Sequence, residues 1–426
     1  MAPPSPPPVE DLLTYLDASP TPYHAAAEAG RRLEAAGSVA VDRSQPWSER
    51  PDRGHLVADG ALVAWSLPPG VASPRLRLVG AHTDSPGLRI KPRPDTGTAG
   101  WRQLGVEVYG GALVNSWLDR DLGLAGRVAV RGPDGVDVRL LRIDEPLLRV
   151  PQLAIHLDRE VTSNGLKLDR QRHLSPVWGV GPVDPGGFRR VVAQHLDVDP
   201  EGVCGWDVMA HDLTPAARVG QGGALVSGGR LDDLCSCWAG LVALAGARPE
   251  GTGSVLVLFD HEEVGSGSTR GAAGPLLAEV LERLVLARGG DRSDLLAALS
   301  QSALASADMA HATHPNYPDR HEPSHPIAID GGPVVKVNAN QRYATEPATQ
   351  VAFEVACDVA GVAVQHFVGH NEVPCGSTIG PLAAAAVGIP TVDVGVAQLA
   401  MHSARELCGS EDPGRMAAAL TAWFEG

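Results

Sequence analysis

The sequence predicts an α/β fold, in which a mainly parallel sheet covered by helices is interrupted by a β-rich insertion. Near both ends of the chain, short apolar runs alternate with stretches of helical length and pattern. From about residue 101 to residue 142, short alternating strands follow one another instead. A length of 426 residues suits two domains. We therefore expect one discontinuous domain, residues 1–91 and 227–426, and an inserted domain, residues 92–226.

The elements follow from the same patterns in chain order. Before the insertion we expect helices at residues 9–16 and 23–36 and strands at residues 62–67 and 76–79. Within the insertion we expect strands at residues 106–109, 126–131 and 136–140. After it we expect helices at residues 234–247, 276–288, 293–302, 347–359, 379–387 and 415–424, and strands at residues 254–259, 364–367 and 391–396, with residues 303–307 as a further candidate strand.

Composition excludes several classes of protein. The 35 basic and 50 acidic side chains give a net charge of −15, which argues against nucleic acid or an anionic membrane as the main partner. The six cysteines form no paired zinc-binding pattern and are expected to be reduced. Residues 2–8 are Pro-rich and lack the features of a signal peptide, and no apolar run reaches the ~18 residues of a membrane helix. We expect a cytoplasmic protein.

Two short motifs carry most of the chemical information. Residues 79–85 (VGAHTDS) and 258–266 (LFDHEEVGS) are apolar runs that end abruptly in metal-ligand and acid/base residues. In open α/β sheets, functional side chains gather at the carboxyl ends of the strands. Asp308 follows the candidate strand at residues 303–307, and His402 follows the strand at residues 391–396. Asp232 stands at the start of a predicted helix.

These residues suit a catalytic site with two metal ions, because zinc accepts histidine nitrogen and carboxylate oxygen. The candidate ligands are His82 and Asp308 for one ion and Glu263 and His402 for the other, with Asp232 as the bridge. Glu262 is the candidate general base, and Asp84 the carboxylate that orients His82. Alternatives remain: His82 is a structural histidine, the two glutamates form a solvated turn, and Asp84 or Asp232 caps a helix.

The chain resembles the aspartyl aminopeptidase family of di-zinc metallopeptidases. The matching stretches are residues 82–92, 154–157, 229–234, 262–266, 306–311, 336–338 with 341–343, and 401–406. The resemblance implies a zinc-peptidase catalytic domain, an inserted dimerisation domain and a homododecameric shell built from dimers. It also implies removal of N-terminal residues, preferably Asp or Glu, from short peptides with a free N-terminus. Two Zn²⁺ ions per chain are expected, with Mn²⁺ or Co²⁺ as possible substitutes.

The resemblance implies three substrate-binding residues and shows one departure. His156 reaches the active site of a neighbouring subunit, although a histidine there is also a possible metal ligand. His311 lines the substrate site. Lys336 pairs with an acidic first residue, unless it points from a strand into solvent. Asp233 stands where many relatives carry asparagine, so an extra charge lies next to the candidate bridge Asp232.

Two other functions compete with an acid-preferring aminopeptidase. The first is a di-zinc hydrolase with broad or neutral aminopeptidase specificity, or one that acts on another amide. The second is a catalytically silent protein that forms a shell or carries a ligand. A silent protein would be favoured by a missing metal ligand, and every expected ligand is present.

Overall fold

The computed structural model describes residues 8–47, 51–133, 135–248 and 250–426. Apart from residue 8, the Pro-rich stretch at residues 2–8 therefore lies outside the described residues. The chain divides into two compact units. The first unit comprises Met1–Asp84, Ala216–Met401 and Glu406–Gly426, and the second comprises Ser85–Pro215 and His402–Arg405. The predicted domain limits and the dimerisation role of the insertion stay predictions.

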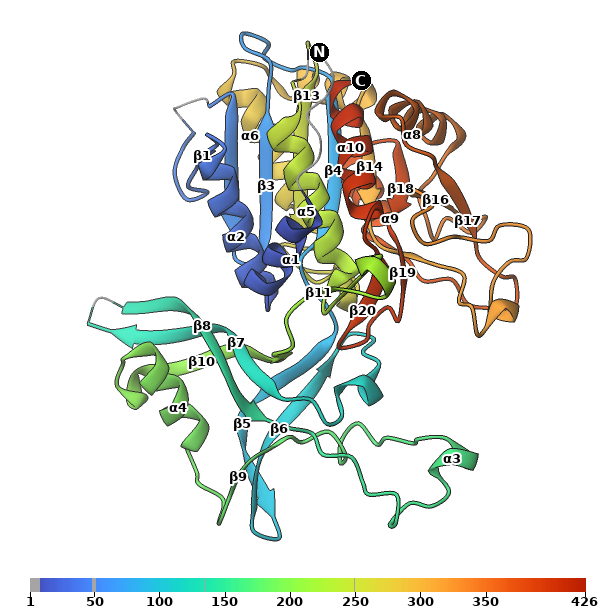
Figure 1. Cartoon of the computed structure of the whole chain (residues 1–426). Coiled ribbons are helices and arrows are strands. Elements are labelled where there is room, and N and C mark those ends of the chain that lie inside the picture. The colour runs from blue at the N-terminus through green and yellow to red at the C-terminus, as the bar shows by residue number, and fades with distance from the viewer. Residues whose placement is uncertain (1–7, 48–50, 134, 249) are drawn as a thin grey trace. The chain divides into compact units, whose positions relative to one another are not determined.

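A nine-stranded sheet forms the centre of the first unit (Figure 1). Its four middle strands are parallel neighbours, because β4 pairs with β13 and β14, and β14 pairs with β18. Antiparallel pairings occur towards both edges, so the sheet is parallel at its centre and mixed outside it. The α/β fold class is confirmed. The strand order is β1 (Val39–Ala40), β2 (Arg53–Ala58), β3 (Ala61–Ser66), β13 (Gly253–Phe259), β4 (Leu76–His82), β14 (Ala303–Ala307), β18 (Thr391–Gly395), β16 (Val334–Val337) and β17 (Gln365–Val368).

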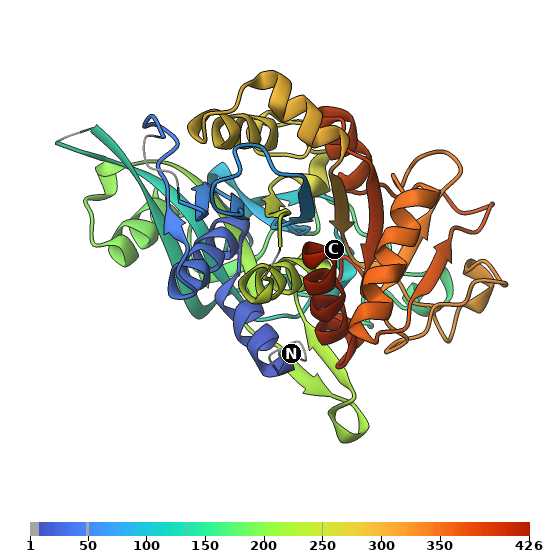
Figure 2. The ribbon, with the colours of Figure 1, turned by 90° about the horizontal axis from the view of Figure 1, so that it is seen from above.

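Helices cover both faces of this sheet, as Figures 1 and 2 show. The sheet needs two covers because its strands are apolar on both faces: in β13, Leu256 and Leu258 pack into one core, and Val255 and Val257 into the other. The first core is covered by α1 (Val9–Ala18), α2 (Pro22–Ala35), α5 (Leu231–Gly246), α8 (Pro347–Ala360) and α10 (Asp412–Glu425). The second is covered by α6 (Leu276–Ala287), α7 (Arg292–Ser300) and α9 (Ile379–Val387).

The first unit also contains a five-stranded sheet that was not predicted. Its strands have two to four residues, too few to display an alternating pattern in sequence. In order they are β11 (Ala217–Val219), β12 (Leu225–Gly228), β20 (Glu406–Gly409), β19 (Ala397–Leu399) and β15 (Ala310–His311). Short 3₁₀ helices occur in both units, at Val114–Trp117, Pro200–Gly202, Gln221–Gly223, Glu262–Val264 and Pro318–Arg320.

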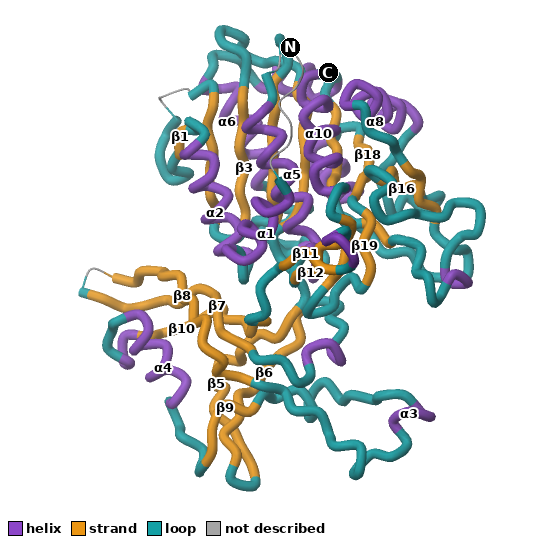
Figure 3. Tube along the Cα trace, viewed as in Figure 1, coloured by secondary structure: helices purple, strands orange, loops and turns teal. Residues whose placement is uncertain are grey.

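The second unit is built on a six-stranded antiparallel sheet (Figure 3). Helix α4 (Gly187–Leu196), which was not predicted, buries Phe188 and Val192 against this sheet, and a short helix α3 spans Val161–Asn164. The strand order is β8 (Gly135–Leu148), β7 (Leu122–Gly132), β10 (Val203–Asp212), β5 (Gly87–Thr98), β6 (Trp101–Tyr109) and β9 (Val177–Val180). No described helix in either unit is long and apolar enough to cross a membrane.

Candidate metal centre

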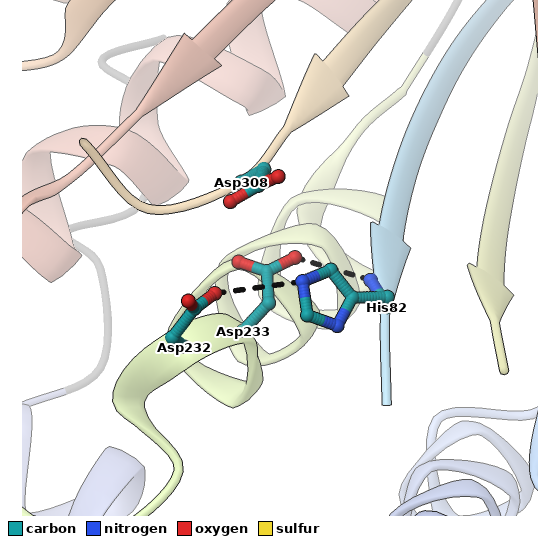
Figure 4. Close-up of side chains that lie close together, drawn as sticks. All are labelled: His82, Asp232, Asp233 and Asp308. Carbon is teal, nitrogen blue, oxygen red and sulfur yellow. Dashed lines mark hydrogen bonds and ion pairs between the residues drawn. The ribbon is translucent and has the colours of Figure 1, made fainter. Parts of the chain in front are cut away.

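His82 lies at the carboxyl end of β4, and its two ring nitrogens have different surroundings. Nδ1 lies 3.0 Å from the main-chain carbonyl oxygen of Asp84, an acceptor that fixes the proton on Nδ1. Nε2 lies 3.4 Å from Oδ1 of Asp232 (Figure 4) and is the nitrogen that a metal ion would bind in place of a proton. The side chain is 1% exposed. This tautomer and orientation suit a histidine that binds a metal ion through Nε2.

The carboxylate of Asp84 joins the ends of two neighbouring strands. Its Oδ1 accepts the main-chain N–H of Glu262 at 3.0 Å, and its Oδ2 accepts that of Glu263 at 3.1 Å. The 3₁₀ turn after β13 is therefore fixed against the end of β4. Oδ1 also lies 3.6 Å from Nδ1 of His82, further than the carbonyl oxygen. Asp84 thus contacts His82 mainly through its backbone, and the carboxylate positions the two glutamates.

Asp232 enters the site from the start of α5, after β12 of the small sheet. Its main-chain N–H donates to Oε2 of Glu406 at 2.9 Å. Sequence reasoning assigned no role to Glu406, which is 2% exposed. The only sequence feature that marks Glu406 is its acidic side chain next to an apolar strand segment. Because the backbone of Asp232 is anchored in this way, its carboxylate faces His82 (Figure 4).

Asp308 follows β14 and is accompanied by the buried side chain of Lys336 on β16. The Lys336 Nζ donates to the main-chain oxygens of Asp308 and Met309 at 3.0 and 3.2 Å, and lies 3.8 Å from Oδ1 of Asp308. It also lies 5.2 Å from the ring centre of Tyr343. Lys336 is 2% exposed, so the alternative that it points into solvent is wrong.

His82, Glu262, Glu263 and Asp308 converge because β4, β13 and β14 are neighbours and run in the same direction, and Asp232 and Asp233 join them from the start of α5. The side chains form two groups in which each residue contributes one ligand atom, and all ligand atoms of a group lie within 4.8 Å of one another. An oxygen of Asp232 also lies within 4.8 Å of an oxygen of Glu263. The two groups are His82, Asp232, Asp233 and Asp308, and His82, Glu262 and Glu263. Figure 4 shows the four side chains of the first group pointing toward one another.

Burial and mutual repulsion shift the pKa values of these groups. Burial, with repulsion from Asp308 and Asp232, raises the pKa of Glu262 to about 7. Burial also raises the pKa of Asp308 to about 6, against the opposing effect of Lys336. Burial disfavours the imidazolium of His82, but the carboxylates around it, Asp233 first, raise its pKa well above the ordinary value. Buried carboxylates in excess favour a cation, and an imidazole with carboxylates is a donor set that fits zinc.

The remaining predicted site residues are His311, His156 and His402. His311, on β15, is exposed, with its ring centre 6.3 Å from that of Phe367. His156 belongs to the second unit and is exposed. His402 also belongs to the second unit, where its Nδ1 lies 3.2 Å from the carbonyl oxygen of Gly111. The roles of all three stay predictions.

The fold and the side-chain geometry agree with a comparison of the whole chain against protein families. The family model described as aminopeptidase I zinc metalloprotease (M18) matches residues 15–424. The chain belongs to the M18 family. It is therefore a zinc metallo-aminopeptidase, a hydrolase of peptide bonds, and the resemblance stated above is confirmed.

Individual M18 proteins are similar over almost the full length. A probable M18 family aminopeptidase 2 of Streptomyces coelicolor is 52% identical over 422 residues, which cover 98% of this chain and 97% of the relative. A chain of the cryo-EM structure of the Ape4 and Nbr1 complex is 34% identical with a TM-score of 0.93, over 98% of this chain and 85% of that one. The S. cerevisiae mApe1 dodecamer is 25% identical with a TM-score of 0.84, over 98% and 96%.

Proposed function

We propose that this M18 aminopeptidase prefers short peptides with a free N-terminus whose first residue is Asp or Glu. The observation that carries the proposal is the position of Lys336. Its ammonium group lies 3.8 Å from Oδ1 of Asp308, which is itself a candidate metal ligand. The two hydrogen bonds to main-chain oxygens use two of its three N–H donors. In the proposal, the third donor binds a carboxylate on the first residue of a peptide.

The metal assignment has two parts. One ion would be held by His82 and Asp308, and the second by Glu263 and His402, with Asp232 shared between them. The support is that an oxygen of Asp232 lies within 4.8 Å of ligand atoms of His82 and Asp308, and of an oxygen of Glu263. Zn²⁺ is the expected ion in both places, and Mn²⁺ or Co²⁺ are possible substitutes, since imidazole and carboxylate ligands also suit them.

Zinc, when bound, supplies a Lewis acid for the scissile carbonyl group and makes a water molecule more acidic. Glu262 accepts the proton of the attacking water and later transfers it to the leaving nitrogen. Asp84 holds Glu262 in place through the main-chain N–H bond described above. His156 of a neighbouring subunit would contact the reacting carbonyl group, and His311 would line the substrate site.

A second candidate function is an M18 aminopeptidase of broad or neutral specificity. The burial of Lys336 favours it, because an ammonium group that is held by the main chain of Asp308 and Met309 already has a structural role in positioning Asp308. In that case Lys336 affects every substrate equally. The two functions therefore predict different results for a substitution of Lys336. An acid-preferring enzyme loses activity mainly on peptides that begin with Asp or Glu, and a broad-specificity enzyme loses it equally on all peptides.

Replacing Lys336 with methionine tests this difference, because methionine keeps an unbranched apolar chain and removes the charge. We expect kcat/KM for peptides that begin with Asp or Glu to fall about 10–100-fold, the loss of one charge-assisted hydrogen bond. For peptides that begin with Ala or Leu we expect less than about a threefold change. The measurement is kcat/KM across a panel of first residues, with bound zinc counted in each sample.

Lys336→Arg keeps the charge, and Lys167→Met removes an exposed lysine of the second unit. We expect Lys167→Met to match the wild type on every substrate, and Lys336→Arg to keep part of the acidic preference. Equal losses on acidic and neutral peptides in Lys336→Met would instead favour the broad-specificity enzyme. A wild type without acidic preference would do the same.

We also propose that the chain self-associates, up to a homododecamer. The support is its similarity to mApe1, whose structure is a dodecamer, and a group of exposed apolar side chains beside His156, namely Leu153, Ile155 and Leu157. Light scattering of the purified protein should give a mass of about twelve chains, or of smaller assemblies built from dimers. A mass of one chain at every concentration would contradict it. The cytoplasmic location stays a prediction.

A further inference from the structure

Asp233 is the second carboxylate at the start of α5, and one of its oxygens has a clear structural partner. Its Oδ2 accepts the main-chain N–H of His82 at 3.1 Å. This bond attaches the start of α5 to the end of β4. The residue is 0% exposed. An asparagine, the residue expected at this position from the family resemblance, would accept the same hydrogen bond through its amide oxygen.

This hydrogen bond does not explain why the second carboxylate oxygen of Asp233 is buried. Within the part of the chain that the structure describes, Oδ1 is buried and has no hydrogen-bond partner. A ligand atom of Asp233 lies within 4.8 Å of ligand atoms of His82, Asp232 and Asp308. In Figure 4 the carboxylate of Asp233 lies among these three side chains. The free oxygen is thus placed with the candidate ligands of one metal ion.

In the described part of the chain, the surroundings of Asp233 lack a lysine or arginine side chain, and the group there that can carry a positive charge is His82, itself a candidate ligand of the ion. Among the described residues, no lysine or arginine forms an ion pair with it, and its neighbours Asp232 and Asp308 are acidic. Asp412, at the start of α10, makes a useful contrast. It is also 0% exposed, its Oδ1 accepts the main-chain N–H of Gly332 at 2.9 Å, and its Oδ2 likewise has no hydrogen-bond partner among the described residues. In contrast to Asp233, however, Asp412 has a guanidinium group beside it, since Arg415 lies 3.1 Å from its Oδ1. A buried carboxylate requires compensation of this kind.

We propose that Asp233 gives Oδ1 to the metal ion of His82, Asp232 and Asp308, and is a fourth protein ligand of that ion. The inference deepens the proposed function, because it rests on the metal site proposed there. It gives the ion one imidazole and three carboxylates, where an asparagine would leave one carboxylate fewer. Additional carboxylate ligands raise the affinity for divalent cations and favour Mn²⁺ relative to Zn²⁺.

The test compares metal binding by the wild-type chain, Asp233→Asn and Asp412→Asn. Zinc and manganese affinities are measured by competition with a chelator, and cobalt binding by its visible absorption spectrum, which reports the number and geometry of the ligands. We expect Asp233→Asn to bind the ion more than ~100-fold more weakly, beyond the usual effect of a residue that merely supports a ligand, with a larger loss for Mn²⁺ than for Zn²⁺ and an altered cobalt spectrum. Asp412→Asn, which removes a buried carboxylate elsewhere in the same unit, should bind as the wild type does.

Two results would overturn the inference. One is an Asp233→Asn variant with wild-type affinities and an unchanged cobalt spectrum. The other is a crystal structure of the zinc-loaded wild-type chain in which Oδ1 lies well beyond the ~2.0–2.2 Å of a zinc–oxygen bond. The crystal structure decides the question even if the variant does not fold. A wild-type chain that binds no divalent cation would instead refute the proposed metal site itself.

Discussion

Replacing Glu262 with glutamine is expected to lower kcat about 10²–10⁴-fold, the usual contribution of a general base. Glutamine has nearly the same shape but cannot accept a proton at neutral pH. The main-chain N–H of residue 262 would still donate to Asp84, so the turn should keep its conformation. We therefore expect an unchanged zinc content and a nearly unchanged KM. The measurement is steady-state kinetics on a peptide substrate, with metal analysis of the same sample.

The pH dependence provides a second measurement of the same group. Glu262 must be ionised to accept a proton, so kcat/KM of the wild type should rise with pH through the pKa of Glu262. Without a metal ion that pKa is raised by burial to about 7, and bound zinc would lower it again because a nearby positive charge favours the carboxylate. The rise should thus lie below pH 7. The residual activity of Glu262→Gln should lack this rise.

The matched control is Glu372→Gln, which removes an exposed carboxylate outside the metal-ligand groups of the first unit. It should have wild-type kinetics at every pH. Wild-type kcat in Glu262→Gln would refute the general-base assignment. A loss of zinc together with activity would point to a metal-binding role for Glu262 instead, since a ligand atom of Glu262 also lies within 4.8 Å of one of His82.

Replacing Asp232 with asparagine is expected to remove nearly all bound metal and, with it, the activity. Asp232 is the ligand proposed to be shared, so its loss weakens both metal sites at once. Its N–H bond to Glu406 is a backbone contact and should persist, which keeps the start of α5 in place. We expect affinities at least ~100-fold weaker, beyond the usual effect of a residue that merely supports a ligand. The measurement is the number of zinc ions per chain after dialysis.

Asp308→Asn makes the decisive comparison, because Asp308 is assigned to one ion only. The wild type should hold about two ions per chain, Asp308→Asn about one, and Asp232→Asn close to none. If Asp232→Asn keeps one tightly bound ion, Asp232 belongs to a single site and is not shared. Circular dichroism of the three proteins separates loss of metal from loss of fold.

The local sequence pattern was sufficient for most strands of the nine-stranded sheet and for the helices that cover it, but not for β1, β2 and β16. The predicted strand at residues 254–259 is β13, Gly253–Phe259, and the candidate strand at residues 303–307 is β14, Ala303–Ala307. Such strands are buried on both faces and therefore appear as continuous apolar runs. Elements with weaker signals were missed. The strands of the small sheet are too short, and α4 lies in a segment whose strands dominate the pattern.

The approximate position of the candidate site was also predictable, but the partners of individual side chains were not. The rule that functional groups gather at the carboxyl ends of parallel strands brings His82, Glu262 and Asp308 to one edge. It does not predict that the carboxylate of Asp84 accepts from the N–H of Glu262, a residue 178 positions later in the chain. Nor does it predict that the charged end of Lys336 is buried against the backbone of Asp308.

The sequence by itself determined the α/β class, the order of most elements and the residue types at the strand ends, because apolar periodicity and abrupt polar ends are local properties of a chain. Only the tertiary structure decided which atom of each side chain faces the others. It showed that His82 contacts the backbone carbonyl of Asp84, whereas the carboxylate of Asp84 accepts the main-chain N–H of Glu262. Among the candidate ligands it also placed an oxygen of Asp233 that has no hydrogen-bond partner within the described chain. Those choices depend on contacts between segments far apart in sequence, for which the local pattern carries no information.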